Sequence, residues 1–504
     1  MESFTLYIVA TIILLLSWKF LQWMKNDFSN IPGPQGVPFL GPLFSVNLER
    51  LHHSFYKWAL KYGTIFKIRM CGNTIVVLND FDFVRKVFAD KENKDFVNDR
   101  PETFVGKFAV FDTSDVVLCR ENNEKFVTLK AIIQKSLKHQ CQSGSFRETF
   151  NAEMERLDAS IDELCGEEIE LKPILRHSFA NFISILLSGE GVDKHLCERL
   201  WKFNDDAFYL LETSINLFLI TFPIARYIPG KVGSVFKGMM TSRNEIIEEY
   251  FQKCKTNEDA NTTHGLVYEL LERQRAVNGE KGHTLIKDEN IMGIILDFIA
   301  AAMKSSSSAT CACFLLLLNH PEHISTIQEE IDEVIGRDRV PEEDDQSKMP
   351  FCRAFIYEVF RYISNGSLGL PHLVTKDIQV DQYRFRKDDI LLSNIWFIHH
   401  DPHFWENPWE FNPARFLGSD GTLLPASHAK MRRIATFSVG RRICPGKDIA
   451  LNRIFLYLTN ILQKFDLLPP VSCAIPSADP RGFVPGLFLD PVPFSCKLIR
   501  RRED

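Results

Sequence analysis

The sequence predicts a mostly α-helical protein with a minor β-sheet, built as a single large domain behind an N-terminal transmembrane anchor. Apolar residues recur every three to four positions through most of the chain, and β-type runs are short and few. After residue 42 no linker rich in Pro, Gly or Ser and no internal repeat divides the chain. The 504 residues, 45% of them hydrophobic, suffice for a large core and exclude a disordered protein.

The anchor is predicted over residues 1–25. Residues 4–23 are almost continuously apolar, which is about one bilayer crossing. The segment lacks the basic start and the small-residue cleavage site of a signal peptide. Because Glu2 precedes the apolar run while Lys19 and Lys25 lie toward its C-terminal end, we expect the bulk of the chain in the cytosol.

Closely spaced prolines in residues 26–42 predict a stiff, extended linker that sets the distance between the membrane and the main domain, residues 43–504. The polar stretch Lys253–His264 is expected to be a surface loop. The net charge of −6 lacks the basic excess that binds nucleic acid. Twelve scattered cysteines without a CxxC pair fit reduced thiols, and 41 phenylalanines predict an aromatic interior suited to an oily ligand.

The elements of the main domain follow from hydrophobic periodicity. The predicted helices are Ala152–Leu164, Leu196–Leu219, Arg243–Lys255, Gly265–Ala276, Asp288–Leu318, Pro321–Gly336 and Ile449–Phe465. The predicted strands are Thr64–Arg69, Thr74–Leu78, Ile378–Val380 and Ile390–Leu392.

One cysteine stands in a setting suited to metal ligation. Residues 437–446 read FSVGRRICPG and lead into the last predicted helix, so Cys444 lies between glycines at a helix entrance. Backbone N–H groups and the positive helix end would stabilise a thiolate there, so we expect a lowered pKa for Cys444. The glycines allow the backbone to approach a flat macrocycle.

This segment resembles the haem-binding loop of the cytochrome P-450 family, F-x-x-G-x-R-x-C-x-G. Its fixed positions are filled by Phe437, Gly440, Arg442, Cys444 and Gly446. The resemblance implies haem b (iron protoporphyrin IX) with Cys444 as axial thiolate, Arg442 paired with a propionate and Phe437 packed beside the sulfur. A thiolate ligand favours oxygen activation over reversible oxygen carriage, so the main domain is expected to be a haem-thiolate monooxygenase.

A second motif supports the resemblance. Glu358 and Arg361 are spaced to meet on one helix face, and the resemblance joins them with Arg415, in the sequence PARF, as a buried network that positions the cysteine loop. The same spacing occurs at Glu153–Arg156 and Glu272–Arg275, which we interpret as solvated helix faces.

Further haem contacts are implied by resemblance alone. His372, in GLPH, would bind a propionate, although a histidine after proline is also an ordinary strand residue. Arg100 lies in the region where the family usually has W-x-x-x-R, and Phe126 and Lys130 take the places of the Trp and the Arg. Lys130 would contact a propionate as a point charge.

The long predicted helix departs from the family pattern A-G-x-acid-T. Counting back from the His-Pro pair at 320–321 gives Ala301-Ala-Met-Lys-Ser, so the acid is replaced by Lys304 and the threonine by Ser305, while Asp297 matches. The family's acid and hydroxyl deliver protons during oxygen activation. Lys304 cannot act as a carboxylate relay. Alternatively, Lys304 points away and Ser305 bonds the carbonyl of Ala301.

The resemblance implies a protein of the endoplasmic reticulum membrane, single-pass with a cytosolic catalytic domain. Electrons from NADPH would come through an acidic diflavin reductase docked near Lys430, Arg432 and Arg433, with a b-type cytochrome as a further candidate partner. The substrate would be a steroid, fatty acid, terpene or xenobiotic. The altered Lys304–Ser305 pair leaves two alternatives open: a haem-thiolate isomerase or dehydratase acting without a reductase, and a non-enzymatic haem- or lipid-binding protein.

Overall fold

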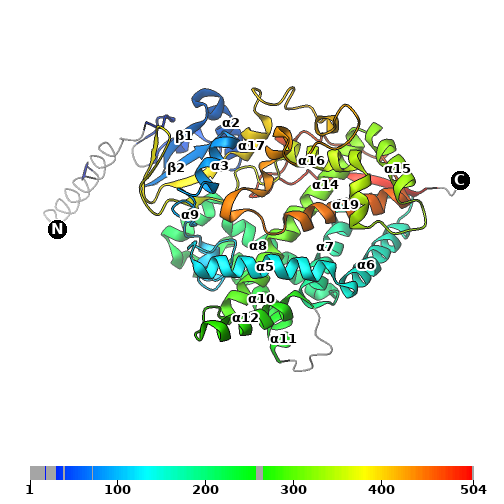
Figure 1. Cartoon of the computed structure of the whole chain (residues 1–504), viewed down its shortest axis with the longest axis horizontal. Coiled ribbons are helices and arrows are strands. Elements are labelled where there is room, and N and C mark those ends of the chain that lie inside the picture. The colour runs from blue at the N-terminus through cyan, green and yellow to red at the C-terminus, as the bar shows by residue number, and fades with distance from the viewer. Residues whose placement is uncertain (1–16, 19–29, 38–39, 71, 257–264, 502–504) are drawn as a thin grey trace. The chain divides into compact units, whose positions relative to one another are not determined.

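The structure, a computed structural model, describes residues 17–18, 30–37, 40–70, 72–256 and 265–501 (Figure 1). These residues form two compact units. The first contains the chain up to Pro101 together with Leu368–Ile398 and Val439–Arg442, and the second contains Glu102–Ser367, His399–Ser438 and the chain from Ile443 onward.

The first unit is built around a four-stranded sheet. Its strands are β1 (Ile65–Met70), β2 (Asn73–Leu78), β4 (His372–Leu373) and β7 (Ile390–Ser393), with β5 (Ile378–Val380) and β6 (Tyr383–Phe385) forming a separate hairpin. Its helices are η1 (Leu43–Ser45), α2 (Leu51–Tyr62), α3 (Phe81–Ala89), η8 (Gly440–Arg442) and the start of α17 (Ile395–His400). The strand order is β1-β2-β7-β4, with β2 and β7 parallel and the other pairs antiparallel. Buried Phe55, Phe66 and Val77 form the core between α2 and the sheet.

The proline-rich segment packs against β1. Ile31 is buried, and Lys67 N donates to Pro32 O at 2.8 Å. A Cβ on Gly33 would lie 2.0 Å from Lys67 O, so only glycine fits at this close approach of two backbones. The described part of the predicted linker is therefore packed into the first unit, against β1.

The second unit is mainly helical. Its helices are α4 (Phe104–Phe108), α5 (Glu124–Gln142), α6 (Gly144–Asp162), α7 (Leu171–Ser188), α8 (Lys194–Leu211), α9 (Thr213–Thr221), η2 (Pro223–Tyr227), α10 (Lys231–Ile247), η3 (Glu248–Gln252), α11 (Lys253–Thr256), α12 (Leu266–Lys281), α13 (Asp288–Asp297), η4 (Phe298–Ala302), α14 (Met303–Asn319), α15 (Glu322–Val334), η5 (Glu343–Lys348), α16 (Pro350–Ile363), η6 (Pro413–Phe416), α18 (Ala429–Arg432), η7 (Ala435–Phe437), α19 (Lys447–Lys464) and η9 (Pro480–Gly482). Strands β3 (Glu168–Glu170), β9 (Ser495–Arg500) and β8 (Phe465–Leu468) form an antiparallel sheet in that order.

Helices α13, η4 and α14 form one continuous helix at the centre of the second unit, where α14 contacts α7, α16 and α19. Among the described residues, Asp288–Asn319 is long and apolar enough to cross a membrane, but most of it is buried inside the protein, as expected of a core helix. The anchor predicted over residues 1–25 lies outside the described residues, apart from Ser17 and Trp18. Most of the predicted loop Lys253–His264 also lies outside them.

The predicted strands are confirmed within two residues at each end, and most predicted helices are found. The single helix predicted over Leu196–Leu219 is wrong, because the helix is interrupted at Glu212, whose backbone angles are not helical (φ −53°, ψ 136°). Beyond the break, Asn216 Oδ1 accepts a hydrogen bond from Phe104 N at 2.8 Å. This tertiary contact ties α9 to the start of α4, and hydrophobic periodicity does not reveal it.

Candidate active site

The cysteine loop is fixed by contacts within the second unit. Cys444 N donates to Phe437 O at 2.9 Å, and Lys130 Nζ donates to Ile443 O at 2.9 Å. The Phe437 ring packs edge-on against Phe360, with ring centroids 5.1 Å apart. Lys130 thus binds the residue that precedes Cys444. At this place its point charge can act on the sulfur or on an anion beside it.

Cys444 is exposed, yet protein atoms surround its sulfur closely enough for burial to raise the pKa of the thiol. The N–H of Gly446 and the charges of Lys130 and Lys447 lower the pKa, as expected for a helix entrance, but burial outweighs them. The expected net lowering is therefore wrong. The groups that would stabilise a thiolate are nevertheless in place.

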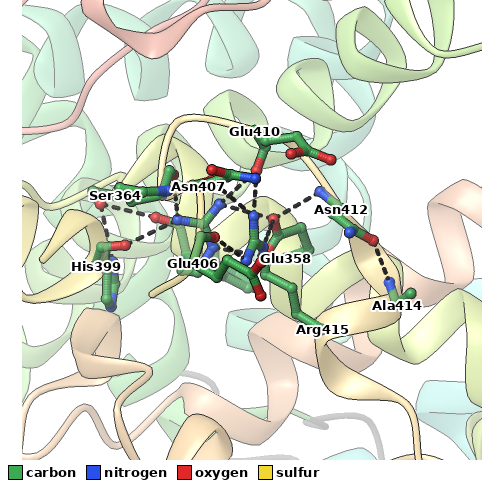
Figure 2. Close-up of polar contacts among 12 residues, drawn as sticks. Glu358, Ser364, His399, Glu406, Asn407, Glu410, Asn412, Ala414 and Arg415 are labelled. Carbon is green, nitrogen blue, oxygen red and sulfur yellow. Dashed lines mark hydrogen bonds and ion pairs between the residues drawn. The ribbon is translucent and has the colours of Figure 1, made fainter. Parts of the chain in front are cut away.

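Glu358 and Arg361 form a fully buried ion pair on α16 (Figure 2). Arg361 Nε and Nη2 donate to the two carboxylate oxygens at 2.7 and 2.8 Å. Glu358 also accepts from Asn412 N at 2.8 Å and from Arg415 Nε at 3.3 Å. The predicted network of Glu358, Arg361 and Arg415 is thus assembled in the structure.

The network reaches the cysteine loop through His399. Arg361 Nη1 donates to His399 O at 2.9 Å. The ring of His399 contacts Ser364 Oγ at 2.9 Å (Figure 2). The same ring accepts from Ala435 N at 2.9 Å. Burial lowers the pKa of His399 to about 3, so the ring is neutral and Nε2 can accept. Ala435 lies two residues before Phe437, so the network can position the start of the loop.

The two other pairs with the spacing of Glu358–Arg361, namely Glu153–Arg156 and Glu272–Arg275, differ in burial. Glu272 and Arg275 are exposed, as expected. Glu153 is buried and accepts hydrogen bonds from Ser178 and Asn181, so the interpretation as a solvated face is wrong for Glu153, while Arg156 is exposed as expected. Spacing within one helix does not show which helix packs over it.

Three basic side chains gather in the first unit. Arg100 donates to the carbonyls of residues 370 and 371 at 3.0 and 2.8 Å, Arg442 Nε donates to Asn98 O at 2.7 Å, and His372 Nδ1 contacts Val97 O at 3.0 Å. All three are buried. Burial, together with the charges of Arg100 and Arg442, holds the pKa of His372 well below its usual value. Such a group of basic donors suits an anionic ligand.

Gly440 precedes Arg442 with a left-handed backbone, φ 72°. A Cβ at this position would lie 2.4 Å from Phe88 O, which a side chain cannot do without moving the backbone. The Phe88 ring in turn stacks on His372, with centroids 4.0 Å apart. The glycine therefore allows the loop to pass close to α3.

The central helix widens just before the altered positions Lys304 and Ser305. Residues 298–302 form a π-helical turn, which often marks functional positions. Ser305 Oγ donates to Ala301 O at 2.6 Å, and Lys304 Nζ donates to Asp490 Oδ2 at 2.9 Å. The alternative in which Ser305 bonds the Ala301 carbonyl is thus the one found.

Asp297 lies just before the π turn and is half-buried. Its Oδ2 accepts from Val116 N at 2.8 Å and from Val117 N at 3.1 Å. Burial, with a contribution from Asp115, raises the pKa of Asp297 well above its usual value. In this position Asp297 joins α13 to the loop at residues 116–117.

Sequence reasoning missed His399, Asp490, Asn204 and Arg453. Asp490 is the carboxylate partner of Lys304, and Asn204 and Arg453 donate to carbonyls of the π turn. An arginine in the apolar pattern of α19 was the one visible signal, because a charge at a buried helical position requires partners.

The second unit is mainly helical, with a cysteine at the entrance of α19 and a buried carboxylate–guanidinium network beside the cysteine loop. This combination defines the class of haem-thiolate oxidoreductases. The family model "Cytochrome P450" matches residues 31–498, across both units. The chain belongs to the cytochrome P450 family, whose cofactor is haem b with an axial cysteine thiolate, and it is an enzyme of the monooxygenase class.

Three relatives illustrate the similarity. The chain is 27% identical to cytochrome P450 2D27 of Mesocricetus auratus over 482 residues, 93% of each chain. It is 29% identical to cytochrome P450 2B15 of Rattus norvegicus over 449 residues, 88% of each chain. It is 26% identical to cytochrome P450 1A5 of Gallus gallus over 469 residues, 90% of this chain and 87% of the relative.

Proposed function

We propose that the protein inserts one oxygen atom of O2 into a lipophilic small molecule, such as a steroid, fatty acid, terpene or xenobiotic, with electrons from NADPH passed through a diflavin reductase. The observation that carries this proposal is the cysteine loop, where Cys444 is exposed at the start of α19 while its backbone is fixed to Phe437. Haem held by such a thiolate activates oxygen for insertion into unreactive C–H bonds.

The side chains present fit the cofactor. Cys444 is proposed as the axial ligand, with Phe437 beside the sulfur and Gly440 and Gly446 leaving room for the macrocycle. Basic side chains suit the two anionic propionates of the haem. The side chains proposed to donate hydrogen bonds to them are Arg100, Arg442, His372 and Lys130. The buried grouping of three of these in the first unit, within range of mutual electrostatic influence, supports this assignment.

Proton delivery is proposed to involve Ser305. Its hydroxyl hydrogen bonds Ala301 O, so the lone pairs on Oγ are available to accept from water. Lys304 is bound to Asp490 and does not supply a carboxylate, so water takes a larger share of proton transfer here. Asp297 is proposed to order the loop at residues 116–117.

A basic surface supports docking of the acidic reductase, with a b-type cytochrome as a second candidate partner. Lys430 and Arg432 lie on α18, where Arg432 is exposed. Arg433 stacks on Phe404, with its guanidinium carbon 4.0 Å from the ring centroid. Replacing Lys430 and Arg432 with Glu is expected to slow electron transfer and weaken its dependence on salt, because steering of an acidic partner is electrostatic.

Membrane attachment is proposed through residues 1–25, at the endoplasmic reticulum with the catalytic domain in the cytosol. A second observation supports contact with lipid: large apolar side chains are exposed along the segment that runs from α9 to just beyond η2. They are Phe218, Phe222, Ile224, Tyr227 and Ile228. Such a patch marks an interaction surface.

The test is turnover by the purified holoenzyme with and without NADPH and reductase, after a spectral screen of lipophilic compounds. The proposal requires product that depends on both. The isomerase or dehydratase alternative is favoured by Lys304, which stands where the family pattern has an acid. This alternative predicts full turnover without electrons. In a single-turnover measurement of oxygen consumption, sustained binding of dioxygen without substrate oxidation would favour the non-enzymatic binding protein.

A further inference from the structure

The π turn of the central helix has side-chain donors at four consecutive carbonyls. Asn204 Nδ2 donates to Ile299 O at 2.8 Å and to Ala300 O at 3.0 Å. The carbonyl of Ala301 accepts from Ser305 Oγ, and that of Ala302 accepts from Arg453 Nη2 at 3.0 Å. Asn204 comes from α8 and Arg453 from α19, so different helices hold the turn.

Such support has a physical reason. In a regular α-helix each carbonyl accepts from the N–H four residues later, whereas a π turn disrupts that ladder and leaves carbonyls in need of other donors. Asn204 is 0% exposed and Arg453 is 2% exposed, so water cannot readily replace these side chains.

Arg453 is unusual in having no carboxylate partner among the described residues. Its guanidinium carbon lies 4.1 Å from the ring centroid of Phe182 and 4.8 Å from that of Phe179, and Nη2 also donates to Ser306 Oγ at 2.8 Å. Its Nε and Nη1 are buried without a hydrogen-bond partner in the described part of the chain. Burial lowers the pKa of Arg453 to about 10, so the side chain keeps its charge at neutral pH.

We propose that Asn204 and Arg453 are positioning residues that hold the π turn open and thereby fix Ser305. Arg453 lies on the helix that begins three residues after Cys444, so one guanidinium links the cysteine-bearing segment to the turn that precedes Ser305. The inference rests on the proposed function for its catalytic meaning, but the contacts themselves are independent of substrate and reductase.

Hydrogen exchange measured by mass spectrometry on the haem-loaded full chain tests the proposal. In Arg453→Met and in Asn204→Leu, peptides covering residues 298–306 are expected to exchange about tenfold faster, because the turn loses its external donors. Thr310→Val is the matched control: Thr310 lies on α14, is buried and has a hydroxyl without a partner in the described residues. Its substitution is expected to leave residues 298–306 unchanged.

Two further readouts separate positioning from general stabilisation. The midpoint of thermal unfolding of Arg453→Met is expected to stay within a few degrees of wild type, because removal of an unpaired buried charge offsets the lost hydrogen bonds. The infrared stretch of carbon monoxide bound to the reduced holoenzyme is expected to shift in Arg453→Met and Asn204→Leu and to stay in place in Thr310→Val. Arg453→Lys, which keeps a charged donor, should partly restore slow exchange.

Unchanged exchange over residues 298–306 in both variants would overturn the proposal. An equal rise in exchange across α7 and α19 would also overturn it, since that pattern reports general loosening. If the exchange results hold but no NADPH-dependent product forms, the proposed function fails while the structural assignment stands.

Discussion

Lys304 Nζ donates to Asp490 Oδ2 at 2.9 Å, and Lys172 Nζ donates to the same oxygen at 2.6 Å. One carboxylate from the C-terminal segment thus bridges two lysines, one on α14 and one on α7. Where the family pattern has an acid on the central helix, this chain has a cation, and its counter-charge comes from another segment. Ser308 Oγ also donates to Leu489 O, at 2.6 Å, so the C-terminal segment is tied to α14 at two adjacent positions.

We predict that Asp490→Asn lowers the free energy of unfolding by about 2–3 kcal/mol, because it leaves two largely buried lysines without their counter-charge. The side chains of Lys172 and Lys304 are 28% and 23% exposed, so solvent reduces this cost relative to a fully buried pair. Denaturant unfolding provides the measurement. The control is the surface pair of Lys253 and Glu249, whose side chains are 63% and 38% exposed, and Glu249→Gln should change little.

The contacts of Asp490 with Lys304 and Lys172 predict that the stability of the fold depends on pH. Burial tends to raise the pKa of Asp490, but Lys304 and Lys172 outweigh it, and the pKa lies below its usual value. A carboxylate with a depressed pKa stabilises the fold above its unfolded pKa of about 4, and this contribution is lost as the pH falls through the folded pKa. The stability difference between wild type and Asp490→Asn should therefore be constant near neutral pH and shrink in acid. A difference that grows on acidification would refute the assignment.

Glu358→Gln should lower the free energy of unfolding by more than Asp490→Asn does. It leaves the fully buried Arg361 without its carboxylate, and breaking such a pair costs about 3–5 kcal/mol. We expect a lower unfolding free energy and poorer haem retention, since His399 and the start of the cysteine loop depend on the network. Glu272→Gln, in an exposed pair of the same spacing, should cost no more than about 0.5 kcal/mol. Equal effects of the two substitutions would contradict the account.

Ser305→Ala should have a limited effect. Since the hydroxyl hydrogen is already donated to Ala301 O, Ser305 contributes an acceptor and not a free donor. We expect product formed per NADPH to fall by no more than about tenfold, below the range of about 10²–10⁴ associated with a general acid. A loss of a hundredfold or more would show that the serine donates a proton in turnover.

Short motifs allowed much of this site to be predicted. The cysteine loop and the Glu358–Arg361 pair are encoded by local spacing, and Arg415 follows in a recognisable segment, so the structure assembles them as expected. Partners chosen by packing were not predictable. Asp490 meets Lys304 across 186 residues of sequence, and Arg453 meets Ala302 across 151.

Burial explains the errors. Glu153 has the same spacing as Glu272, yet α7 covers the first and solvent covers the second. The thiol of Cys444 has the expected N–H group and lysines around it, but desolvation outweighs them. In both cases the local groups are present as predicted, but the conclusion drawn from them was wrong, because local spacing does not show which atoms from distant segments displace water.

The central claim is that Cys444 supplies the sulfur ligand of the haem iron. The most direct test is the carbon monoxide difference spectrum of the reduced Cys444→Ser protein, measured with its porphyrin content, and with Cys473→Ser as an exposed-cysteine control. The account predicts that Cys444→Ser loses the red-shifted band of thiolate-ligated haem while Cys473→Ser keeps it. A Cys444→Ser protein with full porphyrin content and an unchanged spectrum would contradict it.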